Sequence, residues 1–256
     1  MDRMLDATAA SEDRHFWFLG LRRQARLLLK AGLAGRRPRL IVDCGAGTGR
    51  NLEWLSAFGP SVGVELSPTG LKYGRARGRR LVCGTVTQLP FADASADATT
   101  SFDVLYMLDD QAERQAVREM WRILAPGGVA VINAAALDML KGAHSTLTRE
   151  RRRYTRRRLR TLMEESGFRV ERMTFTNFTP LPAALLRRTF ERATGRDQQE
   201  STADLRVPPA PINALFAGAL RLEGAWLRFA NLPIGTSLLT LVRKPNAKFQ
   251  PVTSDL

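Results

Sequence analysis

The sequence predicts an α/β fold in which strands and helices alternate over residues 38–135. Residues 40–44 and 62–66 are short apolar runs of the kind that form buried strands. Residues 111–124 carry apolar side chains at helical spacing, and a proline-glycine-glycine turn at residues 126–128 then stops that helix. This alternation predicts a sheet flanked by helices.

The first strand, residues 40–44, runs directly into a glycine-rich turn and then into a helical pattern that begins at Asn51. Gly45, Gly47 and Gly49 suit the turn because glycine adopts backbone angles that other residues avoid. Glycine also lets a ligand approach the backbone closely, and the N–H groups at a helix start point to the same place. The segment therefore predicts a ligand-binding loop.

The spacing of these glycines, GxGxG, differs from the GxGxxG pattern of nicotinamide-binding folds. The carboxylate of Asp43 would oppose a diphosphate, whereas it suits a ligand with cationic or hydroxyl groups. Residues 42–49, VDCGAGTG, resemble the first motif of the class I S-adenosylmethionine-dependent methyltransferases. The resemblance implies that this loop lies against the adenosine and methionine parts of S-adenosylmethionine. The implied cofactor contacts are Asp43, Gly45, Ala46, Gly47 and Gly49.

The second and fourth strands continue the resemblance in the family's order. Glu65 stands at the carboxyl end of the second strand, beside Leu66, where a carboxylate can accept hydrogen bonds from both ribose hydroxyls. Residues 97–108 resemble the fourth strand and the loop that faces the donor methyl group. Ser101 in this segment, together with Glu65 and Leu66, is therefore an expected cofactor contact.

Residues 84–91, GTVTQLPF, resemble the third motif of the family but depart from it at one position. Thr85 stands where the family usually has an acidic residue that contacts the adenine amino group. Thr85, Gln88 or the backbone must then make that contact, and Thr85 and Val86 are the residues we expect to border the adenine.

The resemblance, to the small-molecule methyltransferase-11-like family in particular, implies a Rossmann-like fold with a seven-stranded mixed sheet flanked by helices. In that topology the last strand runs antiparallel between strands five and six, and a helical insert lies between strands six and seven. The expected segments are an N-terminal helical extension or lid (1–37), the methyltransferase core (38–176), a helical insert or acceptor lid (177–234), the last core strand (235–244) and a tail (245–256).

The N-terminal extension has two parts of different character. Residues 1–14 are polar and small, and we expect them to be loosely ordered. An aromatic cluster at residues 15–18 then opens an amphipathic helix. Such a helix covers the donor pocket in several small-molecule methyltransferases, so His15 and Trp17 are candidate substrate contacts. The alternative is that the helix only packs against the sheet.

Methyl transfer from a sulfonium is an in-line displacement, so alignment of the acceptor provides most of the acceleration. A hydroxyl acceptor gains from a general base, whereas an amine needs little more than a desolvated pocket. His144 is the candidate base because it follows the fifth strand and titrates near neutral pH. Tyr106 and Tyr154 are the candidates to orient the acceptor or to contact the sulfonium.

A dense arginine segment surrounds Tyr154 and has three interpretations. It could be a solvated helix face, or Arg152 and Arg153 could clamp a phosphate or carboxylate of the substrate. It could also contribute to a nucleic-acid surface. The Asn-Pro-Pro-aromatic motif that methylates base amino groups is absent, and residues 101–104 read Ser-Phe-Asp-Val in the equivalent region. Nucleic acid is therefore the less favoured partner.

Composition sets the remaining bounds. The net charge of +14 is carried mostly by arginine and admits nucleic acid, an anionic membrane surface or a phosphorylated substrate. Cys44 and Cys83 are each expected to be small buried residues, and no metal site is expected. No secretory signal and no membrane-spanning run is present, so the expected location is cytoplasmic, with contact to the inner face of the membrane as the alternative. We expect a monomer or a homodimer.

The apolar faces of the insert could pack as core, line an acceptor pocket or meet a membrane. The sequence thus predicts methyl transfer from S-adenosylmethionine to a small-molecule or lipid-like acceptor at O, N or C, partly apolar and with room for an anionic group. The alternatives are an RNA or protein methyltransferase that uses the basic face, and a binding protein that keeps the cofactor fold without turnover.

Overall fold

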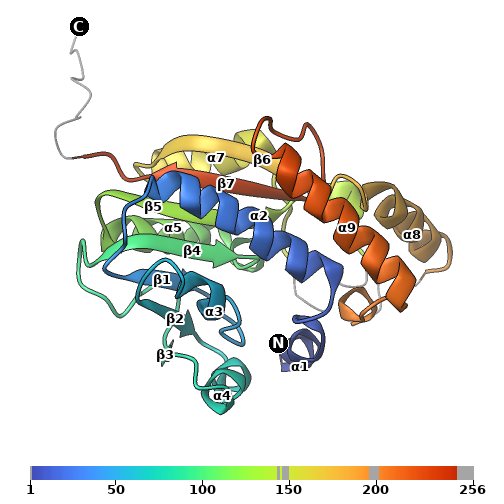
Figure 1. Cartoon of the computed structure of the whole chain (residues 1–256), viewed down its shortest axis with the longest axis horizontal. Coiled ribbons are helices and arrows are strands. Elements are labelled where there is room, and N and C mark those ends of the chain that lie inside the picture. The colour runs from blue at the N-terminus through green and yellow to red at the C-terminus, as the bar shows by residue number, and fades with distance from the viewer. Residues whose placement is uncertain (1, 143–144, 146–149, 196–201, 247–256) are drawn as a thin grey trace, which may run out of the picture.

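The chain is described by a computed structural model over residues 2–142, 145, 150–195 and 202–246, and its centre is a seven-stranded sheet (Figure 1). The strand order is β3-β2-β1-β4-β5-β7-β6, and β7 runs antiparallel to both of its neighbours. The seven strands and the place of β7 between β5 and β6 are as the resemblance implied, so the predicted fold class is confirmed. The strands are β1 (Ile41–Cys44), β2 (Ser61–Glu65), β3 (Leu81–Cys83), β4 (Ala96–Phe102), β5 (Leu124–Ala135), β6 (Arg169–Thr176) and β7 (Ser237–Arg243).

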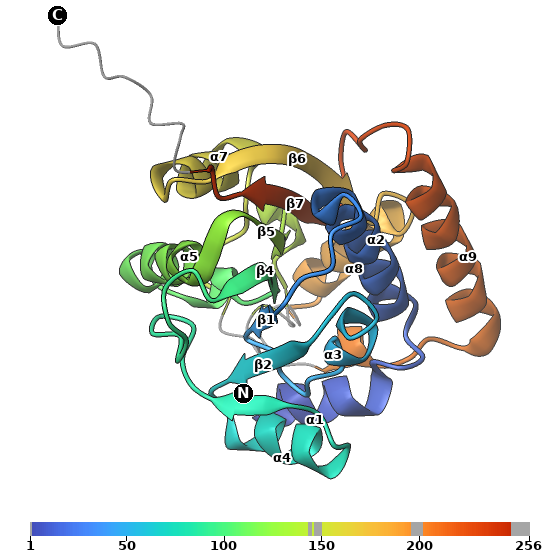
Figure 2. The ribbon, with the colours of Figure 1, turned by 60° about the vertical axis from the view of Figure 1, so that its left-hand side comes forward.

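Helices cover both faces of the sheet, with α2 on one face and α5 and α7 on the other (Figures 1 and 2). The α-helices are α1 (Asp2–Ser11), α2 (Phe16–Leu33), α3 (Leu52–Leu55), α4 (Pro68–Ala76), α5 (Asp110–Ile123), α7 (Arg156–Glu165), α8 (Leu181–Ala193) and α9 (Ala210–Trp226). Single 3₁₀ turns are η1 (Leu105–Met107), η2 (Asp138–Leu140) and η3 (Ala203–Leu205).

The core forms two apolar layers because successive side chains of a strand point to opposite faces. Ile41 and Val131 belong to the layer beneath α2, whereas their neighbours Val42 and Ile132 belong to the layer beneath α5 and α7. A strand that is buried on both faces is apolar at nearly every position. The apolar run at residues 40–44 therefore predicted a buried strand correctly.

The expectation that residues 1–14 are loosely ordered is wrong. Residues 2–11 form α1, and this helix lies against α4. The Thr69 hydroxyl donates to Asp2 at 2.7 Å, and the Tyr73 hydroxyl donates to Asp6 at 2.9 Å. The acidic residues that made this segment look like a solvated terminus are therefore the groups that dock it.

The insert between β6 and β7 packs α9 along α2, side by side in both views (Figures 1 and 2). A Cβ on Gly20 would lie only 2.4 Å from Leu220 Cδ1, so a glycine on α2 lets the two helices approach closely. The Asn213 side chain joins the same two segments, because it accepts the Phe16 N–H at 2.9 Å and donates to the Arg14 carbonyl at 2.8 Å.

The expectation for Cys83 needs correction, and the Ser67 hydroxyl before α4 contacts α1. Cys44 is buried as predicted, but Cys83 is exposed because β3 is the edge strand of the sheet. Ser67 does precede α4, yet its hydroxyl makes no capping hydrogen bond to that helix. It instead lies 3.4 Å from the Asp2 carboxylate, as part of the contact between α1 and α4.

The turn into β7 gives a prediction about stability. A Cβ on Gly235 would lie 2.1 Å from the carbonyl oxygen of Thr176, and a backbone atom cannot move aside as a side chain can. We expect Gly235→Ala to lower the free energy of unfolding by about 1–3 kcal/mol. Gly218→Ala is the control, since it meets nothing within 4 Å on α9 and should stabilise the helix slightly. Urea denaturation of both variants checks this, and equal stability of the two would contradict the packing argument.

Candidate active site

A cavity of about 1050 Å³ opens at the carboxyl ends of the parallel strands, the edge at which α/β folds bind ligands. The turns after β1, β2, β3 and β4 supply one part of its wall, and α1 and the first half of α2 cover it. The end of β5 and the segment that follows it contribute Ala135, Leu140, Glu150 and Arg153, and the insert contributes α8, η3 and α9. Segments far apart in the sequence thus enclose one space.

The glycine loop after β1 has the geometry that its sequence predicted. Gly45, Gly47 and Gly49 have φ values of 80°, 57° and 76°, in the left-handed region that favours glycine. A Cβ on Gly45 would also lie 2.4 Å from Cγ2 of Val104. The loop therefore packs too closely on the segment after β4 to accept a side chain at this position, and its backbone faces the cavity.

Glu65 lies at the end of β2 and holds the loop in place. One carboxylate oxygen accepts the N–H of Gly47 at 2.7 Å, and the other accepts the N–H of Ser67 at 2.7 Å. Burial raises the pKa of Glu65, and the hydrogen bonds from these amides oppose that rise. Glu65 also lines the cavity, and each carboxylate oxygen has a further lone pair with which to accept a ligand hydroxyl.

Asp43 is fully buried behind the loop and does not line the cavity. The Thr100 hydroxyl donates to its Oδ1 at 2.6 Å, since β1 and β4 pair in a register that sets Asp43 opposite Thr100. Its Oδ2 has no hydrogen-bond partner in the described part of the chain. Burial raises the pKa of Asp43 to about 6. Because Asp43 is not part of the cavity wall, this carboxylate supports the loop from behind instead of facing a ligand in the cavity.

The predicted site residues divide into those that line the cavity and those that do not. The lining residues are His15, Trp17, Gly45, Ala46, Gly47, Glu65, Leu66, Thr85, Val86, Tyr106 and Arg153. The predicted residues that are not part of the wall are Asp43, Gly49, Ser101, Arg152 and Tyr154. His144 lies outside the described residues, so its predicted role stays a prediction.

Tyr154 and Arg152 were predicted to meet the acceptor, but the structure places them in a buried cluster around Glu113. The Tyr154 hydroxyl donates to Glu113, and Arg152 and Arg158 contact the other Glu113 oxygen at 2.8 Å and 3.0 Å. Burial and the Glu113 carboxylate raise the pKa of Tyr154. Arg152 also donates to the carbonyl of Leu108 at 2.9 Å. These residues therefore brace the segment after β4 instead of contacting the acceptor.

Arg153 lines the cavity, but its charge already has a partner. Its Nε lies 2.6 Å from the buried Glu150 carboxylate, and its guanidinium also donates to the Ala136 carbonyl at 3.2 Å. His15 is buried at the start of α2, where its Nδ1 accepts the N–H of Trp17 at 3.1 Å. Burial lowers the pKa of His15 to about 4, so this imidazole is neutral at physiological pH.

Asp103 is the cavity residue that the sequence reasoning missed. It follows β4 with a φ of 60°, and both of its carboxylate oxygens accept the Asn133 side-chain amide at 3.0 Å. Burial raises its pKa to about 7, and the Asn133 hydrogen bonds oppose that rise. Its place directly after a central parallel strand was the available signal, because strand ends at this edge carry functional residues.

Comparison with known proteins gives matches over part of the chain. Residues 42–132 match the model of the family described as "Methyltransferase domain". Malonyl-[acyl-carrier protein] O-methyltransferase 1 of Coxiella burnetii is 33% identical over 124 residues, which are 47% of this chain and 42% of that protein. Demethylmenaquinone methyltransferase of Roseiflexus sp. is 35% identical over 136 residues, 50% of this chain and 55% of that protein. The chain spans about half the length of these curated relatives.

Among solved structures, the chain is similar to the 1,6-didemethyltoxoflavin-N1-methyltransferase of Burkholderia thailandensis, which was solved with 1,6-didemethyltoxoflavin and S-adenosylhomocysteine bound. The TM-score is 0.54 at 20% sequence identity, over 88% of this chain and 78% of that chain. A likeness at this identity shows the fold. It agrees with the strand order in confirming a Rossmann-like class I methyltransferase fold.

Burial of Asp43 gives a prediction about pH and stability. Its pKa is raised to about 6 from the ordinary value of 3.8, so the folded state binds this proton more tightly than the unfolded state. Folding stability from this group is present at low pH and is lost as pH rises through about 6. Asp43→Asn has no such loss, so its stability relative to the wild type should rise by about 2 kcal/mol between about pH 4.5 and 7.5.

The check is urea denaturation of wild type and Asp43→Asn at the two pH values. Asp97→Asn is the control of opposite sign, because the Arg39 guanidinium lowers the pKa of Asp97. Its stability relative to the wild type should not rise over the same interval. If the difference in unfolding free energy between Asp43→Asn and the wild type does not change with pH, folding does not raise the pKa of Asp43, and the prediction is wrong.

Proposed function

We propose that the cavity holds S-adenosylmethionine beside an apolar acceptor, on the premise that residues 42–132 match a methyltransferase domain in a class I methyltransferase fold. One observation carries the proposal: the glycine loop and Glu65 border the same cavity as Asp103 and a mostly apolar wall. Its volume of about 1050 Å³ is at the upper end of the roughly 300–1000 Å³ of small-molecule pockets, which leaves room for a second molecule.

The donor half of the cavity offers the groups that this cofactor needs. Gly45, Ala46, Gly47 and Thr48 of the glycine loop border the space closely, and Glu65 has acceptor capacity for ribose hydroxyls. Asp43 lies beneath the loop, outside the cavity wall, where it accepts the Thr100 hydroxyl and joins β1 to β4. Thr85 and Val86 line the part of the wall where the resemblance expects adenine. These residues fit S-adenosylmethionine, which supplies an electrophilic methyl group on a sulfonium.

Asp103 is the residue that could take a proton from the acceptor. It is partly buried, it lines the cavity, and no cation pairs directly with it among the described residues. A carboxyl group with a pKa of about 7 is a stronger base than an ordinary aspartate and is still half ionised at neutral pH. The Asn133 amide fixes its orientation. The Asp103 carboxylate would then accept the hydroxyl or ammonium proton that the acceptor loses as its new bond to carbon forms.

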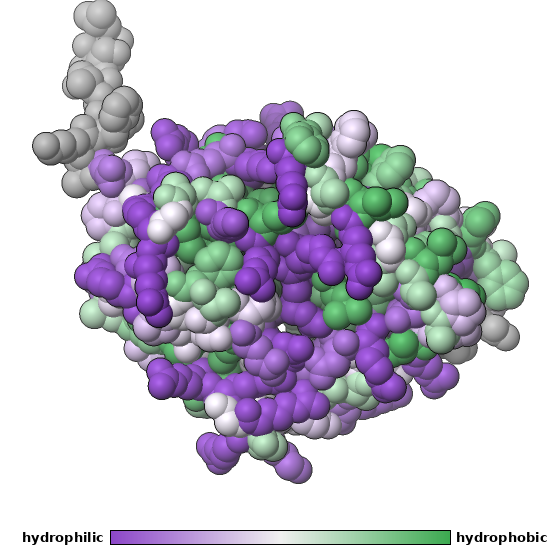
Figure 3. All heavy atoms as spheres, viewed as in Figure 1, coloured by the Kyte–Doolittle hydropathy of each residue, from purple (hydrophilic) through white to green (hydrophobic). Residues whose placement is uncertain are grey.

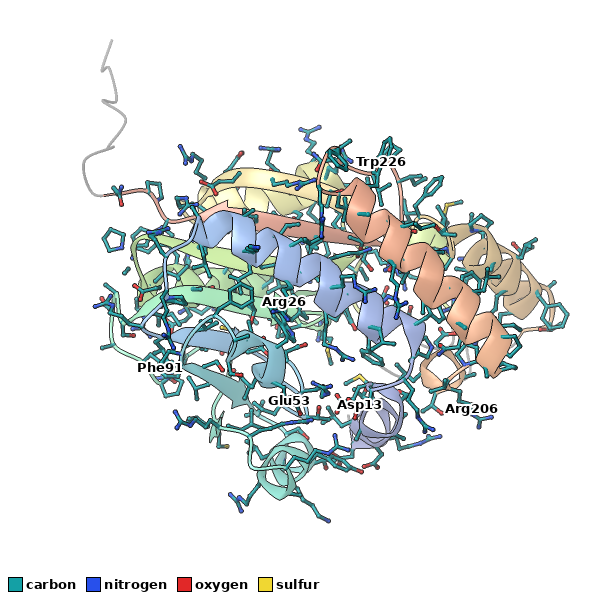
Figure 4. The ribbon with its side chains drawn as sticks, viewed as in Figure 1. Asp13, Arg26, Glu53, Phe91, Arg206 and Trp226 are labelled. Carbon is teal, nitrogen blue, oxygen red and sulfur yellow. The ribbon has the colours of Figure 1, made fainter. Side chains whose placement is uncertain are left out.

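The other groups around the cavity favour a small-molecule or lipid-like acceptor with an apolar body. Phe16, Trp17, Leu140 and Phe216 are among the lining residues, and charged neighbours such as Arg153 are paired within the chain. Arg206, in contrast, lines the cavity and is exposed (Figure 4). It could meet an anionic group at the end of the acceptor that reaches solvent.

The alternative of an RNA or protein methyltransferase rested on the arginines around Tyr154. Arg152 and Arg158 are both bound to Glu113 and Asp110, and Arg153 is bound to Glu150. These three arginines are already paired with carboxylates, so they attract phosphates less than the sequence suggested. This observation supports the small-molecule proposal.

Calorimetric titration with S-adenosylmethionine and S-adenosylhomocysteine tests the proposal, with NAD as the negative control. We expect the first two to bind and Glu65→Ala to weaken both by about 1–3 kcal/mol, because the variant loses hydrogen bonds to ribose and the anchor of Gly47. Glu164→Ala, an exposed position on α7, is the matched control and should bind like the wild type. Binding of NAD alone would overturn the proposed cofactor.

Asp103→Asn tests the proposed base. With labelled donor and a hydroxyl acceptor, wild-type turnover should rise with pH and level off above about pH 7, because the base must be ionised. The variant should not show this rise of turnover with pH, and its rate should be lower by a factor of about 10²–10⁴. Asp93→Asn, which alters an exposed carboxylate, should keep both. A rate loss that is matched by weaker donor binding in calorimetry would instead assign Asp103 to holding the donor.

A further inference from the structure

The helix α9 carries an apolar stripe on the side that faces away from the rest of the molecule. Leu215, Leu222 and Trp226 are spaced by seven and four residues, so they lie on one face of the helix, and Phe229 continues the row. Their exposed fractions are 69%, 74%, 56% and 86%. Trp226 projects from the end of α9 in Figure 4, and apolar side chains gather on that side of the molecule in Figure 3. We call these four residues the α9 stripe.

The opposite side of α9 is firmly packed, so the stripe does not arise from a poorly placed helix. Leu220 is fully buried beside Gly20 of α2. The Phe216 ring lies 5.0 Å from the ring of Phe16 and lines the cavity. Glu223 is buried and accepts the backbone N–H of Thr179 at 2.6 Å. The inward face is thus complete, and large apolar side chains stand on the outward face without a protein partner in the described chain.

The surface around the stripe is cationic. Arg221 and Arg228 are exposed beside it, and no described acidic group pairs with either of them. Between residues 205 and 236 the sequence has a single acidic residue, Glu223, and its carboxylate is turned inward. Arg23 of α2 adds a third positive charge, since its side chain lies within 3.5 Å of a Cβ built on Gly224.

We propose that the α9 stripe docks on the surface of an anionic lipid bilayer, with Leu222, Trp226 and Phe229 entering the headgroup region. A helix that presents apolar residues flanked by arginines binds in the plane of such an interface. A second copy of the chain is a poorer partner. A two-fold contact would bring Arg221 and Arg228 of both copies together, within chains that each carry a net charge of +14. A peripheral contact needs no spanning segment, and no helix of the described residues is long and apolar enough to cross a bilayer.

This contact would set the cavity beside the lipid. Phe216 lines the cavity and Leu215, the residue before it on α9, belongs to the stripe, so one helix separates the cavity from the docking face. Arg206 lies by the start of the same helix, where it is exposed and borders the cavity (Figure 4). A lipid-like acceptor could therefore reach the cavity from the bilayer. The docking itself does not depend on methyl transfer and is tested without any cofactor.

Co-sedimentation with vesicles tests the docking. We expect the full chain to bind vesicles of phosphatidylcholine with about one-third phosphatidylglycerol, and to bind pure phosphatidylcholine at least about tenfold more weakly. Leu222→Ser/Phe229→Ser should reduce binding to the anionic vesicles by at least about tenfold, because it removes the buried apolar contact. Arg221→Gln/Arg228→Gln should reduce it by about tenfold at low salt and by less at high salt.

Two controls separate the stripe from general surface properties. Val82→Ser changes an exposed apolar residue on the edge strand β3, and Arg75→Gln/Arg118→Gln removes two exposed charges from α4 and α5. Both should bind vesicles within about twofold of the wild type. The proposal is overturned if the wild type does not bind anionic vesicles. It is overturned as well if Arg75→Gln/Arg118→Gln loses as much binding as Arg221→Gln/Arg228→Gln. It is also overturned if light scattering finds a dimer that Leu222→Ser/Phe229→Ser converts to monomer.

Discussion

The Glu65 carboxylate is the contact on which the donor half of the molecule depends. It accepts the N–H groups of Gly47 and Ser67, each at 2.7 Å, and so ties the glycine loop after β1 to the start of α4. The two elements are also in close contact, because a Cβ on Gly70 would lie 2.6 Å from the Gly47 carbonyl oxygen. Loop and helix therefore cannot shift separately, and the backbone groups that face the cavity keep a fixed direction.

The cover over this half is held by the same elements. The Thr48 hydroxyl, within the glycine loop, donates to Glu12 at 2.6 Å, and Arg77 at the end of α4 contacts Glu12 at 3.0 Å. Asp13 lies at the junction of α1 and α2, where it pairs with Arg50, which also pairs with Glu53 (Figure 4). Acidic residues before α2 thus meet basic and hydroxyl groups of the site, and α1 lies over the cavity because of these pairs.

Glu113 and Asp103 are two acidic residues near the acceptor half of the cavity, and their surroundings give them different roles. Glu113 is surrounded by a tyrosine hydroxyl and two guanidinium groups, so its charge is balanced where it lies. Asp103 accepts hydrogen bonds from the Asn133 amide, and burial raises its pKa to about 7. A charge that has been compensated holds the structure together. A carboxyl group that is buried without a direct cation can exchange a proton near neutral pH.

The sequence by itself determined the strands, the glycine loop and the position of Glu65, because these depend on local signals. Apolar runs, side-chain period and left-handed glycines act within a few residues of each other. The strand order followed from resemblance to a family whose fold is known, and the comparison with solved structures agrees. The same reasoning placed Tyr154 and Arg152 at the acceptor, since a dense arginine segment gives no indication of which acids it will meet.

Only the tertiary structure decided where Tyr154, α1 and the two faces of α9 lie. The contacts that place them join residues that are far apart in the chain. Tyr154 and Glu113 are 41 residues apart, and Asp2 and Thr69 are 67 residues apart. In α9 apolar residues occur on both sides, so the pattern does not say which side is the core. Packing of Leu220 on Gly20 of α2 decides it and leaves the Trp226 side exposed. A local pattern states that a face is apolar, whereas the partner that covers it is set by the fold as a whole.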